Sequence, residues 1–414
     1  MPVHDPYFIA KRAPAAENAD YMPVTDMAAM RAYRLARLKK ALSDRDCDAG
    51  LFFDPVNIRY ATGTRNMAAF TQHNPDRYAF VATNGPVTLF DAYRSSNPQD
   101  HLETIDSYRP SRFWYFETKG DRVEEAVEIF AEDIAEVARA AGGTSWRLAV
   151  DKIWAPLIEP LTRRGFTLVD GQAVAETARS IKSAEEIACM NASLAACDIG
   201  IARMQEALKP GISEIALWTE LARTNLELGG EWMETRLLTS GGRINPWYQE
   251  CSGKLIRPGE LVAFDTDMVG PYGYCADVSR TFFCGPGKPS DEQRRLYALA
   301  HEQIMHNVEL MRPGMTFREI AEKAWPIPDD FIASRYGSIA HGVGLLDEYP
   351  DIPHLIDWEE TGFDGVLQEN MTLCIESYIG EVGGSEGVKL EEQVLVTANG
   401  PQILSMYPFE EALL

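Results

Sequence analysis

FDTDMVGPYGYCADVSRTF, residues 264–282, is the stretch around which this chain is organised. Asp265 and Asp267 stand at the end of an apolar run, and a turn-prone segment leads from there to Asp277 and a β-like run over 278–283. Because side chains alternate along a strand, Asp265 and Asp267 are expected to point the same way. The stretch therefore predicts a hairpin with three carboxylates on one face.

Clustered carboxylates repel one another unless cations neutralise them, and their oxygens suit hard or borderline divalent metals. Taken alone, the stretch is equally consistent with an acidic, solvated hairpin. Three later side chains favour a metal site: His341 opens an HGVG turn, Glu376 ends an apolar run, and Glu391 precedes a strand-like run. Together they predict a two-metal carboxylate site with one imidazole, a donor set that accepts iron, manganese, cobalt or zinc. The candidate ligands are Asp265, Asp267, Asp277, His341, Glu376 and Glu391.

Length and composition restrict the class of protein. With 414 residues, two domains are expected, and the net charge of −23 argues against nucleic acid or an anionic membrane as a partner. The seven cysteines are scattered without metal-ligand spacing, which is typical of free thiols in a reducing compartment. The first residues lack the apolar core of a signal peptide, and no apolar run is long enough to span a bilayer. We therefore expect a cytoplasmic protein.

The order of helical and strand patterns predicts three parts: an N-terminal arm over 1–25, a first domain over 26–180 and a second over 181–414. In the first domain helices and strands alternate, which is typical of an α/β unit. The predicted helices are 27–42 and 121–141, and Asp26 is expected to cap the first of them. The predicted strands are 50–53, 77–83, 87–90 and 147–150. Asp54-Pro55 is expected to turn the chain after the first strand.

The second domain contains an internal echo. It opens with a capping box, Ser183 with Glu186, and a helix expected to reach Leu208. The segment LKPGIS at 208–213 then recurs as MRPGMT at 311–316, 103 residues later, and each copy lies between two helices. The strands that end at Asp265 and Glu376 follow at similar distances. This pattern predicts a duplicated helix-helix-strand unit whose halves each deliver a carboxylate to one site, with chance similarity of a Pro-Gly turn as the alternative.

The full set of motifs resembles the pita-bread, creatinase-type metallopeptidase family. The segments that carry the resemblance are GYCADVSRTF, HGVG, NMTLCIES and VKLEEQVLV in the second domain, PVNIRYATG at 55–63 in the first, and RSIKSAEEI at 179–187 between the domains. The resemblance implies a mixed α/β (α+β) fold. It also implies a pita-bread catalytic domain with an internal duplication, preceded by a creatinase-like N-terminal domain.

Two departures from the peptidase pattern bear on function. Peptidases of this family carry a histidine where this chain has Trp247 or Tyr248, and a second histidine, before a glutamate, where it has Asp347 before Glu348. An aromatic ring attracts a sulfonium or quaternary ammonium cation, and a partly desolvated carboxylate can accept a carbon-bound proton. With EWMETRLLTSG and NPWYQEC, these features resemble the dimethylsulfoniopropionate lyases of this fold, which release dimethyl sulfide and acrylate.

That resemblance implies a metal-dependent carbon–sulfur lyase with Asp347 as the general base. It implies two divalent metal ions per subunit, with iron favoured and zinc, manganese or cobalt as alternatives, and a homodimer that binds a small sulfonium substrate. The implied substrate-binding aromatics are Trp247, Tyr248 and Tyr336. Two other functions stay open: a metal-dependent Xaa-Pro dipeptidase or aminopeptidase, and an inactive binding protein on the same scaffold.

Overall fold

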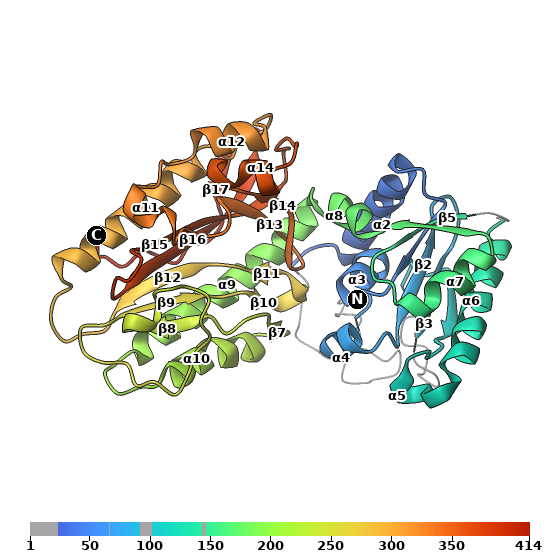
Figure 1. Ribbon diagram of the computed structural model, residues 1–414, viewed down its shortest axis with the longest axis horizontal. Coiled ribbons are helices and arrows are strands. Elements are labelled where there is room, and N and C mark those ends of the chain that lie inside the picture. Colours follow the sequence, from blue (N-terminus) through green and yellow to red (C-terminus); the bar gives the residue numbers. More distant parts are fainter. Residues whose placement is uncertain (1–23, 66, 92–101, 143–145) are drawn as a thin grey trace. The chain divides into compact units, whose positions relative to one another are not determined.

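The computed structural model describes residues 24–65, 67–91, 102–142 and 146–414 of the chain. The predicted N-terminal arm lies outside the described residues up to residue 23. The chain divides into two compact units, Met1–Arg179 and Ser180–Leu414, and each is described by itself (Figure 1).

The first unit is a six-stranded mixed sheet in the order β4-β3-β2-β1-β5-β6. Its strands are β1 (Ala49–Phe52), β2 (Tyr78–Ala82), β3 (Val87–Asp91), β4 (Ser107–Pro110), β5 (Trp146–Val150) and β6 (Phe166–Asp170). Its helices are α2 (Met27–Asp44), α3 (Pro55–Thr62), α4 (Ala68–His73), α5 (Phe116–Lys119), α6 (Val123–Ala140), α7 (Ala155–Arg163) and α8 (Gln172–Arg179), with a 3-10 turn at Gly120–Arg122.

Most predicted elements of this unit are confirmed. The Asp26 carboxylate caps α2 by accepting hydrogen bonds from the backbone N–H groups of Ala28 and Ala29. The predicted strands 77–83 and 87–90 are present as β2 and β3, which pair antiparallel. One expectation is wrong: Asp54-Pro55 does not turn the chain back but begins α3, because the Asp54 carboxylate accepts from the N–H of Val56 and the proline sits in the first helical turn.

The second unit has two halves that each combine helices with a sheet. Its helices are α9 (Ala184–Ala207), α10 (Glu214–Glu227), α11 (Asp291–Val308), α12 (Phe317–Lys323), α13 (Asp329–Ile332) and α14 (Trp358–Thr361), with 3-10 turns at Gly241–Arg243, Pro271–Gly273 and Leu355–Asp357. Its strands are β7 (Trp232–Met233), β8 (Leu238–Ser240), β9 (Leu261–Asp265), β10 (Met268–Val269), β11 (Cys275–Ala276), β12 (Ser279–Phe283), β13 (Ala340–Val343), β14 (Asp347–Ile352), β15 (Thr372–Gly380), β16 (Gly387–Thr397) and β17 (Gly400–Ile403).

The predicted duplication is present in backbone detail. Gly211 and Gly314 both have left-handed φ values, +91° and +89°, which a residue with a side chain rarely adopts. The Gly211 N–H donates to the carbonyl of Ile256 at 2.8 Å, and the Gly314 N–H donates to the carbonyl of Leu367 at 2.9 Å. The next helix of each half, α10 or α12, is then capped by Ser213 or Thr316. The two halves therefore share one local architecture.

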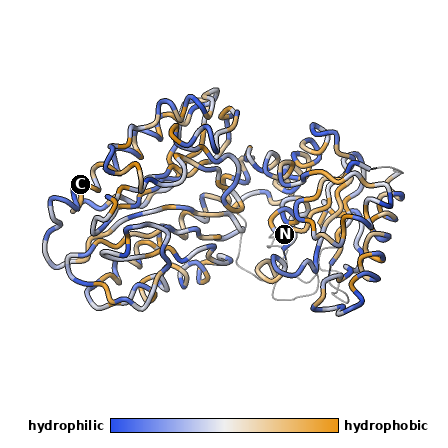
Figure 2. Tube along the Cα trace, viewed as in Figure 1, coloured by the Kyte–Doolittle hydropathy of each residue, from blue (hydrophilic) through white to orange (hydrophobic). Residues whose placement is uncertain are grey.

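Two hydrophobic cores hold the halves together around the strands. One core packs α11 and α12 against β15 and β16, and the other packs α9 and α10 against β9 and β12. In Figure 2 the hydrophobic residues concentrate on the strands and on the inner faces of the helices. The strands that carry the acidic residues are thus fixed from both sides, which gives the site a rigid frame.

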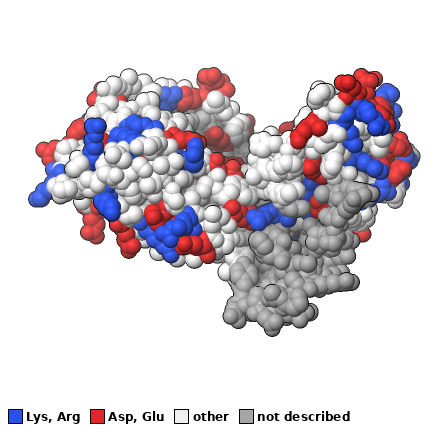
Figure 3. All heavy atoms as spheres, turned by 90° about the horizontal axis from the view of Figure 1, so that it is seen from below, with Lys and Arg blue, Asp and Glu red and all other residues white. Residues whose placement is uncertain are grey.

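Two surface properties concern possible partners. By length and composition alone, one helix among the described residues, α9, is suited to cross a membrane, but half of its most apolar window is buried, in the core that it shares with α10. On the face drawn in Figure 3, Lys and Arg side chains are interspersed with Asp and Glu side chains rather than gathered in a patch of one sign.

Candidate metal centre

The first half of the second unit contributes three aspartates. Asp265 is the last residue of β9 and lies opposite Ser279 of β12. Asp267 is not placed by strand alternation, as the sequence suggested, because β9 ends at Asp265 and Asp267 has a left-handed φ of +34°. The backbone N–H of Asp267 instead donates to Asp277 Oδ1 at 3.3 Å. The break in the strand, rather than its regularity, brings the three carboxylates together, with one oxygen of each within 4.8 Å of the others.

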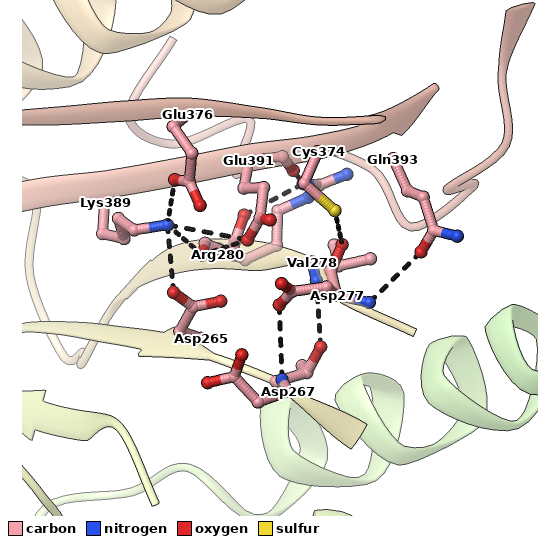
Figure 4. A network of polar contacts seen from close by, with 12 residues as sticks. Asp265, Asp267, Asp277, Val278, Arg280, Cys374, Glu376, Lys389, Glu391 and Gln393 are labelled. Carbon is pink, nitrogen blue, oxygen red and sulfur yellow. Dashed lines mark hydrogen bonds and ion pairs between the residues drawn. The ribbon is translucent and has the colours of Figure 1, made fainter. Parts of the chain in front are cut away.

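The second half supplies the remaining predicted ligands. Glu376 and Glu391 lie directly opposite each other within β15 and β16, rather than at the end of one strand and before another as the sequence suggested. His341 on β13 lies opposite Cys374 on β15. Donor atoms within 4.8 Å of one another form two further groups. One consists of Asp265, Glu376 and Glu391, and the other of Asp277, His341, Cys374 and Glu391. The structure thus brings all six predicted ligand residues into one connected cluster, in which the carboxylates are buried and His341 is half-buried. Figure 4 shows the five carboxylates.

Two members of this cluster were missed in the sequence. The ammonium of Lys389, fully buried, lies 2.5 Å from Glu376 Oε2, 3.1 Å from Asp265 Oδ2 and 3.5 Å from Glu391 Oε2. Cys374 is also buried at the site. Each residue stands two positions before a predicted glutamate ligand on the same strand. Since strand side chains alternate, that spacing was a signal that could have identified both residues.

The cluster carries more negative charge than its own cation neutralises. Burial would raise the pKa of Asp265, but the Lys389 ammonium lowers it to about 2. Burial and the neighbouring carboxylates hold the pKa values of Asp267, Asp277 and Glu391 well above their ordinary values. Burial and mutual repulsion destabilise the ionised form of these carboxylates, and a bound cation would stabilise it.

The donor set fits two divalent cations. Five carboxylates and one ammonium leave four negative charges, which two divalent ions neutralise when the imidazole is neutral. Among the described residues, Asp265 Oδ1 and Glu391 Oε1 are buried without a hydrogen-bond partner. Leaving such oxygens unpaired in a protein interior is costly, and bound cations would remove that cost.

Asp347 and Glu348, adjacent on β14, have different surroundings. Asp347 keeps 55% of its side chain exposed and its Oδ1 lies 3.9 Å from His341 Nδ1. Partial burial, together with the charges of Asp265 and Glu376, raises the pKa of the Asp347 carboxyl. Glu348 is buried, and its carboxylate is bound to the Lys182 ammonium at 2.9 Å and to the N–H of Leu345 at 2.9 Å. Asp347 is therefore the accessible carboxylate of the two.

The three predicted aromatic residues lie together beside the metal centre. Trp247 is 6% exposed and Tyr248 is 58% exposed, and the Tyr248 and Tyr336 ring centroids are 5.5 Å apart. The Lys389 ammonium lies 4.6 Å from the ring centroid of Tyr336 and 5.9 Å from that of Trp247. One face of each ring therefore already meets a cation. A cavity of about 450 Å³ is lined by all three aromatics together with Tyr378 and the segment 333–335.

A buried carboxylate that sequence reasoning missed holds the loop with Trp247 and Tyr248. Glu214 accepts hydrogen bonds from the backbone N–H and the hydroxyl of Ser240, and from the same two groups of Ser252, at 2.7–3.0 Å. Arg243 also bonds to it. Glu214 thereby joins both ends of the 240–252 segment. Its position directly after the N-cap Ser213 resembles that of any surface helix carboxylate, so the sequence held no signal for this role.

Comparisons with known families agree with both units. Residues 188–398 match the model described as "Metallopeptidase family M24", and residues 34–181 match the "Creatinase/Prolidase N-terminal domain". Among solved structures, the dipeptidase PepE from Mycobacterium ulcerans superposes with a TM-score of 0.73 at 23% identity, covering 93% of this chain and 98% of that one. The Xaa-Pro dipeptidase from Bacillus anthracis gives 0.72 at 20% identity, with 91% and 98% coverage. These structures establish the pita-bread fold.

The curated relatives include proteins named as lyases and proteins named as peptidases. The chain is 39% identical over 403 residues to "Dimethylsulfoniopropionate lyase DddP" of Roseovarius nubinhibens, which covers 95% of this chain and 89% of the relative. It is 36% identical over 400 residues, with the same coverage, to the protein of that name from Roseobacter denitrificans. It is 26% identical over 381 residues to an Xaa-Pro dipeptidase of Pyrococcus furiosus, covering 90% and 97%.

Proposed function

This chain belongs to metallopeptidase family M24. We propose that within this family it is a lyase that splits dimethylsulfoniopropionate into dimethyl sulfide and acrylate. The observation that carries the proposal is Asp347, an accessible carboxylate 3.9 Å from His341 at the edge of the candidate metal centre. The peptidases that this sequence resembles have a histidine there. The two relatives named as lyases, at 39% and 36% identity, support the same reading.

Asp347 has the properties that a general base for this elimination requires. It takes the proton from the carbon next to the substrate carboxylate, and the electron pair of that C–H bond becomes the new carbon–carbon double bond. The carbon–sulfur bond breaks and its electron pair leaves with sulfur, so the cationic sulfonium departs as neutral dimethyl sulfide. The raised pKa of Asp347 makes it a stronger base, and its exposure lets the proton pass on to solvent.

The site offers complementary groups for both charged ends of the substrate. When bound by Asp265, Asp267, Asp277, His341, Glu376 and Glu391, two divalent cations, for which iron is our first choice, would supply Lewis acidity toward the substrate carboxylate. The aromatic rings of Tyr248 and Tyr336, with Trp247 beside them, offer electron-rich faces for the dimethylsulfonium group. Since Lys389 meets one face of Tyr336, the sulfonium would use the remaining ring surface.

The second candidate is an Xaa-Pro dipeptidase. It is favoured by the 26% identity to the Pyrococcus furiosus enzyme and by the fold shared with solved dipeptidases. Against it stands the absence of imidazoles at positions 247, 248 and 347, where the peptidases resembled here carry histidine. In either case we propose a cytoplasmic protein, since all seven cysteines are free and buried, as is typical of a reducing compartment. We propose a homodimer on the family resemblance alone.

The test is a direct comparison of the two reactions. The protein is loaded anaerobically with Fe²⁺, and separately with Mn²⁺, Co²⁺ or Zn²⁺, and supplied with dimethylsulfoniopropionate or with an Xaa-Pro dipeptide. We expect dimethyl sulfide in the headspace and no free proline. Proline release without dimethyl sulfide would replace the proposal by the dipeptidase. Metal binding with neither product would favour a binding protein.

A further inference from the structure

Lys389 is a buried cation built into the candidate metal centre. It lies on β16, where strand alternation turns it to the same side as Glu391, and it has no exposed surface. Its ammonium reaches carboxylates from both halves of the unit, Asp265 on β9 and Glu376 on β15, as Figure 4 shows. A lysine is rarely buried completely unless its charge is paired, and here the partners are candidate metal ligands.

The ammonium uses one oxygen of each carboxylate that it contacts. It bonds Oε2 of Glu376 at 2.5 Å and pairs with Oδ2 of Asp265 at 3.1 Å. It also donates to the Ser279 hydroxyl at 2.7 Å, and that hydroxyl donates to Oε2 of Glu391 at 2.9 Å. Lys389 and Ser279 together therefore fix one oxygen on each of three candidate ligands.

The other oxygen of each carboxylate is held by neither Lys389 nor Ser279. Among the described residues, Asp265 Oδ1 and Glu391 Oε1 are buried without any hydrogen-bond partner. Glu376 Oε1 lies 3.3 Å from Nε2 of His341, itself a candidate ligand. The division is consistent across three residues: the lysine and serine hold one oxygen, and the other oxygen either has no hydrogen-bond partner, as in Asp265 and Glu391, or approaches His341, as in Glu376.

We propose that Lys389 is a positioning residue of the metal centre, which acts with Ser279 to orient the metal-binding oxygens of Asp265, Glu376 and Glu391. The inference rests on the metal binding in the proposed function and not on the lyase reaction. Partners that orient metal ligands in this way are worth about 10–100-fold in metal affinity. The tyrosine and tryptophan rings that flank the ammonium, Tyr336 and Trp247, help to keep it in place.

Two other roles for Lys389 predict different effects of its removal on metal affinity. If Lys389 acted only as a competing positive charge, its removal would strengthen metal binding, because cations repel one another. If it acted only through packing, its removal would lower stability and leave the metal affinity of the folded protein unchanged. Only the positioning role predicts weaker binding by a folded protein.

The experiment measures Mn²⁺ and Zn²⁺ binding to the full-length, metal-stripped protein by competition with a fluorescent chelator, without substrate. We expect Lys389→Gln to bind each ion about 10–100-fold more weakly, and Lys389→Arg, which keeps a cation, to bind within a few-fold of the parent. Ser279→Ala, a small change that removes the bridge to Glu391, should weaken binding in the same direction by less. Circular dichroism in chelator reports whether each variant is folded.

Lys182→Gln is the matched control, because Lys182 is also a buried ammonium in an ion pair but contacts Glu348 rather than a candidate ligand. It should lose stability and keep its metal affinity. Equal or tighter Mn²⁺ binding by folded Lys389→Gln overturns the proposal. If Lys389→Gln does not fold, Ser279→Ala decides: unchanged affinity overturns the proposal and weaker affinity supports it. A parent that binds neither ion would instead contradict the metal centre itself.

Discussion

Replacing Asp347 by asparagine separates the base from the rest of the site. The amide keeps the shape of the side chain but cannot accept a proton from carbon. Asp347 begins β14, is 55% exposed, and lies outside the groups of candidate metal donors within 4.8 Å of one another. Asp347→Asn should therefore fold, retain its metals and bind substrate, and change only the step that removes the proton.

The size of the expected loss follows from the worth of a positioned base. General base catalysis contributes about 10²–10⁴ in rate, so kcat should fall by that factor while KM changes little. At about 1.4 kcal/mol for each factor of ten, the transition state loses roughly 3–6 kcal/mol. Initial rates of dimethyl sulfide release, measured by gas chromatography at saturating substrate, give kcat directly. Metal content measured on the same samples shows whether the centre is intact.

Glu348→Gln is the control, because it alters the neighbouring carboxylate without touching the exposed one. Glu348 is paired with Lys182 in the interior, so this change should lower the free energy of unfolding by about 3–5 kcal/mol. At a temperature where the variant is still folded, turnover should remain close to that of the parent. Near-parental turnover by a folded, metal-loaded Asp347→Asn protein would refute the assignment of the base.

Three further predictions concern metal, substrate and pH. His341→Ala and Asp277→Ala should each lose metal and activity, because both residues belong to one group of candidate donors. Each variant should keep the circular dichroism spectrum of the folded parent. Full activity of a metal-free variant would contradict the metal centre. Tyr336→Ala and Trp247→Ala should each raise KM for the sulfonium substrate more than tenfold, since a desolvated cation–π contact is worth about 2 kcal/mol. The inhibition constant of acrylate, which has no cation, should change less. Equal losses of affinity for the substrate and for acrylate would mean that the rings only pack. Burial lowers the pKa of His354 from 6.5 to about 4. As pH falls, the histidine of the unfolded chain is therefore protonated before that of the folded protein. The free energy of unfolding of the parent should fall between pH 6.5 and pH 4 by up to about 3 kcal/mol. In His354→Gln, the free energy of unfolding measured with urea should depend less on pH between 6.5 and 4. The same pH dependence as in the parent would show that this histidine is not the cause.

Much of the second unit was predictable because its signals are local. A Pro-Gly turn followed by a capping residue defines its backbone within a few residues, and the two copies at 208–213 and 311–316 adopt the same hydrogen-bond pattern. The convergence of the candidate ligands was also predictable, since a carboxylate within an apolar strand is costly to bury unless it is paired or binds a cation. The same local logic found the capping box of α9.

Other features depend on contacts between distant segments. Asp267 reaches the cluster through a left-handed residue and a hydrogen bond to Asp277, not through the strand alternation that the sequence implied. Lys389 and Glu214 look like ordinary charged residues until the fold buries them against partners far away in the chain. Whether Glu348 or Asp347 faces the site depends on an ion pair with Lys182, 166 residues earlier, which no local pattern encodes.

The central claim is an elimination, and the three-carbon product tests it most directly. The metal-loaded protein is incubated with dimethylsulfoniopropionate, and both products are quantified by proton NMR in a sealed tube. Removal of the proton by Asp347 predicts acrylate and dimethyl sulfide in equal amounts. Displacement of sulfur by water would give 3-hydroxypropionate with the same dimethyl sulfide, and that product, or the absence of any dimethyl sulfide, would contradict the account.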